Sequence, residues 1–158
     1  MKIKINKLIE KLEYSFSGSP LYGESLMAKL TKIEMEMVNF VPLGFTKSIA
    51  KLLQHIIYWR IFTIEKLTET SGLNKLDDWS DITITSLGDW ENLLGKLKVS
   101  QEELIKILKS KSDDFLIKKL PNRKYDYEYL IEGTIQHDIY HLGQIALLSK
   151  QAKIEILK

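Results

Sequence analysis

Apolar side chains recur at helical spacing from one end of this chain to the other, and this periodicity points to an all-α fold. The first example is the set Ile5, Leu8, Ile9, Leu12 and Phe16, whose steps of three and four residues place all five on one helical face. The alternation of period two that marks a half-buried strand is almost absent. We therefore expect amphipathic helices that bury their apolar faces against one another.

Turn-forming residues divide this pattern into segments. The sequence predicts four long helices, over about 2–16, 47–69, 89–109 and 127–151. Four long helices with one elaborate and one extended connection indicate a four-helix bundle.

The connections carry weaker signals. Shorter helical segments are expected at 24–37 and 113–120. Within the first of these, Thr31 and Glu34 have the spacing of a capping box, which suggests that a helix restarts there. The stretch 73–87 mixes Asn, Asp, Ser and Gly with a tryptophan and is expected to be a long loop, of a length that is often functional.

Length and composition fit one domain, over 1–158. A chain of 158 residues buries enough surface on folding to form a core without a disulfide or a structural metal. It contains no cysteine, which excludes a disulfide framework, a thiolate zinc site and a cysteine nucleophile. Any metal that this chain binds is therefore free to have a functional role.

Charge and hydropathy restrict the classes of partner and the cellular compartment that we expect. The formal net charge is +2, too nearly balanced to indicate a nucleic acid or an anionic membrane as partner. No stretch approaches the roughly 18 apolar residues that a membrane span needs. The Lys-rich N-terminal segment spaces its apolar residues along a helix instead of joining them into the core of a signal peptide. We therefore expect a cytoplasmic protein.

Two of the three histidines, His137 and His141, stand four residues apart in the last predicted helix. At about 100° per residue, this spacing puts both imidazoles on one face, one turn apart. A helical wheel places them on the stripe of Leu130 and Leu148, which should face the core. A polar group buried there must be hydrogen-bonded, coordinated to a metal or exposed to an internal cavity.

The third histidine, His55, lies midway along the second long predicted helix on another apolar face, beside Leu52 and Trp59. Because neighbouring bundle helices lie about 8–10 Å apart, His55 can meet His137 and His141 across the interior. Three neutral imidazoles bind Zn²⁺ or Ni²⁺ well and leave coordination positions for water or substrate. We therefore predict one divalent transition-metal ion in an open site formed by the three histidines. The alternative for His55 is a core histidine bonded to a backbone or tyrosine partner.

Other metal sites explain the pattern less well. The segment 137–141 has the spacing of the HExxH motif, but Asp138 replaces the general-base glutamate, and its shorter side chain would reach a water less easily. A ferritin-like di-iron bundle needs two Glu-x-x-His motifs, and the sequence has none. Asp138 is then either a partner that orients a histidine or a solvated helix carboxylate.

The same residues resemble a known family. The segments HIIYWR at 55–60 and HDIYHLGQI at 137–145, supported by YGES at 22–25 and SIA at 48–50, look like the DinB/YfiT-like superfamily of metalloenzymes. The resemblance implies a four-helix bundle, commonly dimeric, with one divalent metal held by three histidines. The three metal ligands that the resemblance implies are His55, His137 and His141 in this sequence. Members of that superfamily include thiol transferases that use low-molecular-weight thiols such as bacillithiol, and a mycothiol-dependent isomerase.

Two functional hypotheses follow. The first is a metal-dependent enzyme, a hydrolase or a low-molecular-weight-thiol S-transferase, that acts on a small molecule. Its candidate catalytic side chains are Tyr140, Gln144 and Asp138, although Tyr140 and Gln144 are as readily explained as partners of buried polar neighbours. The second is a bundle whose metal is structural or sensory and that acts through protein contacts. A pocket beside the metal favours the first hypothesis, and Trp59 and Trp79 either wall such a pocket or belong to the core.

The last predicted helix carries a second apolar stripe, which bears on whether the protein forms oligomers. The stripe comprises Ile135, Ile139, Leu142 and Ala146, about 120–180° around the helix from Leu130. A helix with two apolar faces is either enclosed by its own chain or used in association. Together with the family resemblance, the stripe predicts a homodimer.

Overall fold

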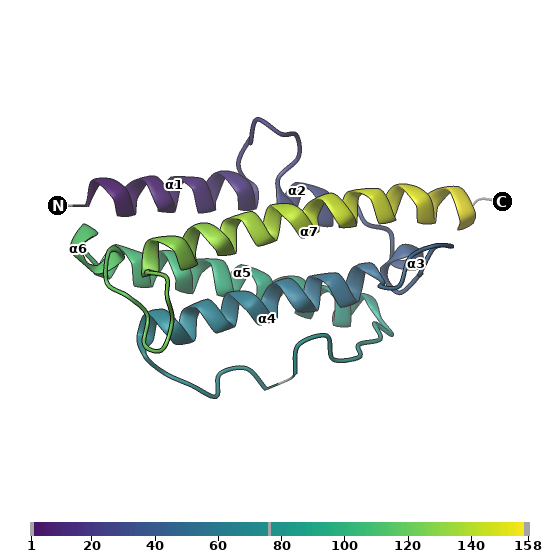
Figure 1. Ribbon diagram of the computed structural model, residues 1–158. Coiled ribbons are helices and arrows are strands. Elements are labelled where there is room, and N and C mark those ends of the chain that lie inside the picture. Colours follow the sequence, from purple (N-terminus) through teal and green to yellow (C-terminus); the bar gives the residue numbers. More distant parts are fainter. Residues whose placement is uncertain (1, 76, 157–158) are drawn as a thin grey trace.

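In the computed structural model, four long helices lie side by side and form a bundle (Figure 1). The structure describes residues 2–75 and 77–156. The long helices are α1 (Ile3–Ser17), α4 (Ile49–Thr68), α5 (Leu87–Ser110) and α7 (Tyr127–Ile156), and the short ones are α2 (Leu26–Leu30), α3 (Met35–Val38) and α6 (Asp113–Leu116). No strand occurs in the described residues, so the all-α prediction is confirmed. None of the helices in these two ranges combines the length and the apolar character of a membrane span.

The helices run in an order that requires a long crossover. α1 and α7 point in one direction, and α4 and α5 point in the other (Figure 1). α4 packs against α5 and α7, and α1 packs against the same two helices. Because α4 and α5 are consecutive and parallel, the segment 69–86 that connects them runs back along the length of the bundle. The predicted loop at 73–87 is therefore confirmed as part of this crossover, except for Leu87, which begins α5, and residue 76, which lies outside the described residues.

The predicted helix boundaries are close to the observed ones, but one restart signal is wrong. Thr31 does not begin a helix. It is the C-cap residue of α2, and its Oγ1 donates to the carbonyl of Met27, one turn earlier, at 3.0 Å. Glu34 is the N-cap residue of α3 and makes no side-chain cap. A capping box occurs at the start of α5, where Ser86 Oγ accepts from the Asp89 amide and the Asp89 carboxylate accepts from the Ser86 amide. The last helix continues past its predicted end at 151 to Ile156.

The core consists of two apolar clusters, one toward each end of the bundle. Along α4, one cluster ends at Ile57 and the other begins at Ile64. Between them the four long helices contribute buried polar side chains, among them Ser15, Arg60, Gln101 and Asp138. A polar layer therefore crosses the middle of an otherwise apolar core.

The second apolar stripe of α7 is covered in part by the chain itself. Ile135 and Leu142 are buried, each in one of the two core clusters. Ile139 and Ala146 are half-buried and line surface hollows beside Tyr22. The homodimer stays a prediction.

Candidate metal centre

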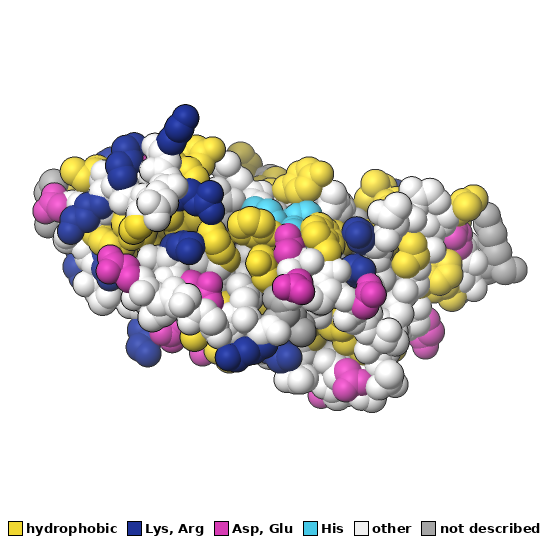
Figure 2. Space-filling model, turned by 60° about the horizontal axis from the view of Figure 1, so that its bottom comes forward, with side chains coloured by type: hydrophobic (Ala, Val, Ile, Leu, Met, Phe, Trp, Pro, Cys, Tyr) yellow, Lys and Arg dark blue, Asp and Glu magenta, His cyan; other side chains and the backbone are white. Residues whose placement is uncertain are grey.

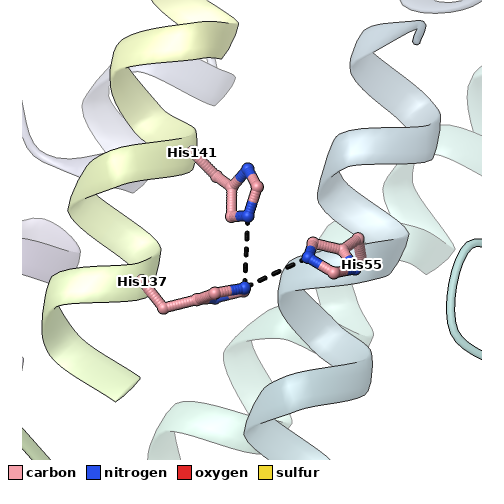
Figure 3. Close-up of side chains that lie close together, drawn as sticks. All are labelled: His55, His137 and His141. Atoms are coloured by element: carbon pink, nitrogen blue, oxygen red, sulfur yellow. Dashed lines mark hydrogen bonds between the residues drawn. The ribbon is translucent and has the colours of Figure 1, made fainter. Parts of the chain in front are cut away.

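The three histidines meet in the middle of the bundle, His55 from α4 and the other two from α7 (Figure 3). Nε2 of His137 lies 3.1 Å from Nε2 of His55 and 3.1 Å from Nε2 of His141. One nitrogen of each ring lies within 4.8 Å of the other two. Two tetrahedral zinc ligands, each about 2.0–2.1 Å from the ion, stand about 3.3 Å apart. The structure thus brings the three histidines together at a spacing suited to one ion.

Hydrogen bonds fix the outer nitrogens of two of these rings. Nδ1 of His55 lies 2.5 Å from Oδ1 of Asp78, and Nδ1 of His141 lies 2.6 Å from Oε1 of Gln144. Carboxylate and amide oxygens only accept hydrogen bonds, so both Nδ1 atoms carry a hydrogen and donate it. The Nε2 atoms of His55 and His141 therefore present lone pairs to the centre.

This arrangement of lone pairs fits a cation. Both of these Nε2 atoms approach Nε2 of His137, which carries at most one hydrogen to share between them. Burial lowers the pKa of His141 to about 4 and also lowers the pKa of His55, although the hydrogen bond that His55 donates to Asp78 opposes this shift. Both rings are therefore neutral at neutral pH, which is the form that binds metals. The donor set suits a divalent transition metal.

Asp138 is only 3% exposed, so its interpretation as a solvated carboxylate is wrong. The fully buried Arg60 donates from Nε to Oδ2 of Asp138 at 2.8 Å, and its Nη2 lies 2.7 Å from the same oxygen. Nη1 of Arg60 donates to Oε1 of Gln101 at 2.8 Å. The other Asp138 oxygen lies 3.9 Å from Nδ1 of His137, and within the described residues neither atom has a hydrogen-bond partner. Asp138 is therefore engaged by Arg60 and does not face the inner nitrogens.

The other two candidate catalytic residues differ in position. Gln144 contacts the centre indirectly, because it accepts from Nδ1 of His141. Tyr140 is 64% exposed, and its ring lies edge-on to that of His141 with the centroids 5.0 Å apart. Gln144 thus holds a histidine in place, whereas Tyr140 lies at the surface beside the centre.

The crossover 69–86 supplies two contacts to His55 that the sequence did not reveal. Asp78 accepts from its Nδ1, and Trp79 stacks on its ring with centroids 3.6 Å apart and planes at 13°. Trp79 has a φ of 62°, in the left-handed region that few non-glycine residues adopt. Gln54 of α4 ties the loop down by donating to the Ser80 carbonyl at 2.8 Å. The length of the loop and its Asp and Trp residues were the available signals.

A hollow of about 260 Å³ opens beside His137. The half-buried Trp59 forms part of its wall, so this tryptophan belongs to a pocket and not only to the core. Its other lining residues are Phe62, Thr63, Tyr125, Tyr129, Leu130, Gly133 and Thr134. Figure 2 shows histidine atoms at the molecular surface between hydrophobic side chains. The centre is therefore accessible from outside.

Comparison with known proteins agrees with the resemblance seen in the sequence. Residues 24–145 match the family model of the DinB superfamily, a range that includes α4 and all three histidines. No curated protein matches the chain. Because the family model covers more than half of the sequence and the helical fold agrees with it, this chain belongs to the DinB superfamily.

Proposed function

We propose that this protein is a metal-dependent enzyme that acts on a small molecule, as a hydrolase or as a low-molecular-weight-thiol S-transferase. The observation that carries the proposal is the convergence of three imidazole nitrogens beside an accessible hollow. His55, His137 and His141 would hold one divalent ion, Zn²⁺ or Ni²⁺, which such a donor set binds well.

The surrounding residues keep the three rings ready for an ion. Asp78 and Gln144 hold hydrogens on the outer nitrogens, which leaves the inner nitrogens free as ligands. Trp79 covers one face of the His55 ring and fixes its plane. A bound ion supplies Lewis acidity, which polarises a substrate oxygen or lowers the pKa of a water or thiol, so that a nucleophile exists near neutral pH.

Exposure favours different roles for the candidate catalytic residues. Tyr140 has an exposed ring beside His141, so its hydroxyl is available to a substrate at the mouth of the site. Gln144 acts as a positioning residue, since its Oε1 accepts from Nδ1 of His141, whereas the Asp138 carboxylate is held by Arg60 and is buried away from a substrate.

The alternative is a bundle whose metal is structural or sensory. A structural zinc site is closed by four protein ligands. In the described part of this chain the cluster has three members, and a hollow adjoins one of them. Both observations favour an open, reactive site.

Turnover by metal-loaded protein tests the proposal. Protein stripped with a chelator and reloaded with Zn²⁺ or Ni²⁺ is assayed for thiol transfer, with cysteine, glutathione or bacillithiol and an electrophile, and for ester and amide hydrolysis. We expect turnover in the loaded protein, and none in stripped protein or in His137→Ala. If the wild-type protein takes up the ion but turns over no substrate faster than His137→Ala in any of these assays, the enzymatic proposal is wrong.

A further inference from the structure

We propose that the hollow beside His137 binds an uncharged aryl group of the substrate, while the reacting part of that substrate lies at the histidines. The inference rests on the proposed function, because it assigns a substrate class to the same centre. The hollow has about 260 Å³, below the range of about 300–1,000 Å³ that holds drug-sized ligands. It therefore suits one compact group of one or two rings.

Aromatic rings form two sides of the hollow. Trp59 and Phe62 of α4 lie on one side, with centroids 5.1 Å apart and planes at 64°. Tyr125, which precedes α7, and Tyr129, in the first turn of α7, have ring centroids 5.2 Å apart. The Trp59 ring also lies 5.9 Å from that of His137, which links this wall to the centre. Such walls favour a flat ring, because aromatic pairs prefer offset and edge-to-face packing.

The floor of the hollow offers space but no hydrogen to donate. A Cβ at Gly133 of α7 would meet nothing within 4 Å, so the missing side chain leaves room for a ligand. The hydroxyls of Thr63 and Thr134 lie 2.8 Å apart, and each also bonds to a carbonyl of its own helix. Two hydrogens serve these three contacts, and none remains for a ligand. The floor therefore accommodates an apolar group.

Charge distinguishes an aryl group from a quaternary ammonium, which aromatic rings can also enclose. No carboxylate is among the described residues that line the hollow. Nζ of Lys66 lies 5.0 Å from the centroid of the Phe62 ring, and an ion at the histidines would add further positive charge. A cationic ligand would be repelled from both sides, and an anion would find no hydrogen-bond donor on the floor, so the group is neutral.

Two hydroxamates with the same metal-binding head test this assignment. Benzohydroxamate carries a phenyl group where acetohydroxamate carries a methyl group. By isothermal titration calorimetry, we expect the Zn²⁺-loaded protein to bind benzohydroxamate about tenfold more tightly. In Gly133→Leu, whose new side chain fills the hollow, that ratio should fall below about twofold. Gly95→Leu is the matched control, because a Cβ at this α5 glycine also meets nothing within 4 Å, and it should keep the ratio.

Failure of the aryl site and failure of the metal centre give different results. If both hydroxamates bind equally well, or if a trimethylammonium hydroxamate binds more tightly than benzohydroxamate, the aryl site is overturned and the metal centre stands. If neither binds, the metal-centre proposal fails. The aryl site is then tested on metal-free protein by ligand-observed NMR with 2-naphthol. We expect saturable binding that Gly133→Leu abolishes and Gly95→Leu keeps; equal binding by both variants overturns the site.

Discussion

Two clusters of polar side chains, one buried and one with the half-buried His137, lie in the middle of this bundle, and they balance charge differently. The arginine cluster comprises Arg60, Gln101 and Asp138, and the histidine cluster comprises His55, His137 and His141. In the arginine cluster a cation meets an anion and an amide, so the charges balance within the chain, although Oδ1 of Asp138 has no hydrogen-bond partner among the described residues. In the histidine cluster, lone pairs face one point and need a cation from outside. Buried polarity alone therefore does not mark a functional site; lone pairs that converge on one point without a cation do.

The largest expected effect comes from breaking the arginine cluster. Arg60→Leu leaves the Asp138 carboxylate buried without its cation, which should lower the free energy of unfolding by about 3–5 kcal/mol. Urea denaturation followed by circular dichroism measures this change. The double variant Arg60→Leu/Asp138→Leu should recover most of the loss, because apolar replacement of both partners removes the unpaired charge. A single variant as stable as the wild type would contradict this description of the cluster.

A smaller effect is expected from the partner that orients His55. Asp78→Ala removes the acceptor for Nδ1 of His55 and should weaken metal binding about 10–100-fold, the usual cost of losing such a partner. The fold should persist, because the Asp78 side chain is 29% exposed. Competition with a chromophoric chelator measures the affinity. Asp77→Ala removes the same charge one residue away and should bind the ion like the wild type; equal losses in both variants would argue for a general charge effect.

The last prediction concerns the pH dependence of stability and tests the histidine cluster. Burial lowers the pKa of His141 from 6.5 to about 4 in the folded protein. Between these values the unfolded chain takes up a proton that the folded protein does not. The free energy of unfolding of metal-free protein should therefore fall as the pH drops from 6.5 toward 4. Urea titrations across this range should show a flatter dependence in His141→Gln, and an unchanged slope would contradict the assignment.

Helical periodicity explains how much of this structure could be predicted. A helix repeats every 3.6 residues, so the sequence itself places His137 and His141 on the stripe of Leu130 that faces the core. The same rule put His55 on an inner face of α4, which the structure bears out. The long helices were predictable for the same reason, because their apolar faces are continuous.

Features that depend on contacts between distant residues were not predictable. Asp78 lies in a loop, where no periodicity relates its position to His55. Arg60 and Asp138 are 78 residues apart, and charged residues on helices are usually solvated, so nothing local indicated that both are buried. Thr31 had capping-box spacing, but its hydroxyl bonds back to the preceding turn, an alternative that spacing alone does not distinguish.

Metal stoichiometry tests the central claim most directly. Protein purified without a chelator or an affinity metal is dialysed against a slight excess of Zn²⁺ or Ni²⁺ and analysed for bound metal. We predict one ion per chain in the wild type and almost none in His137→Ala, with the same far-UV circular dichroism in both proteins. Equal metal content in the two proteins would show that these three imidazoles do not hold the ion.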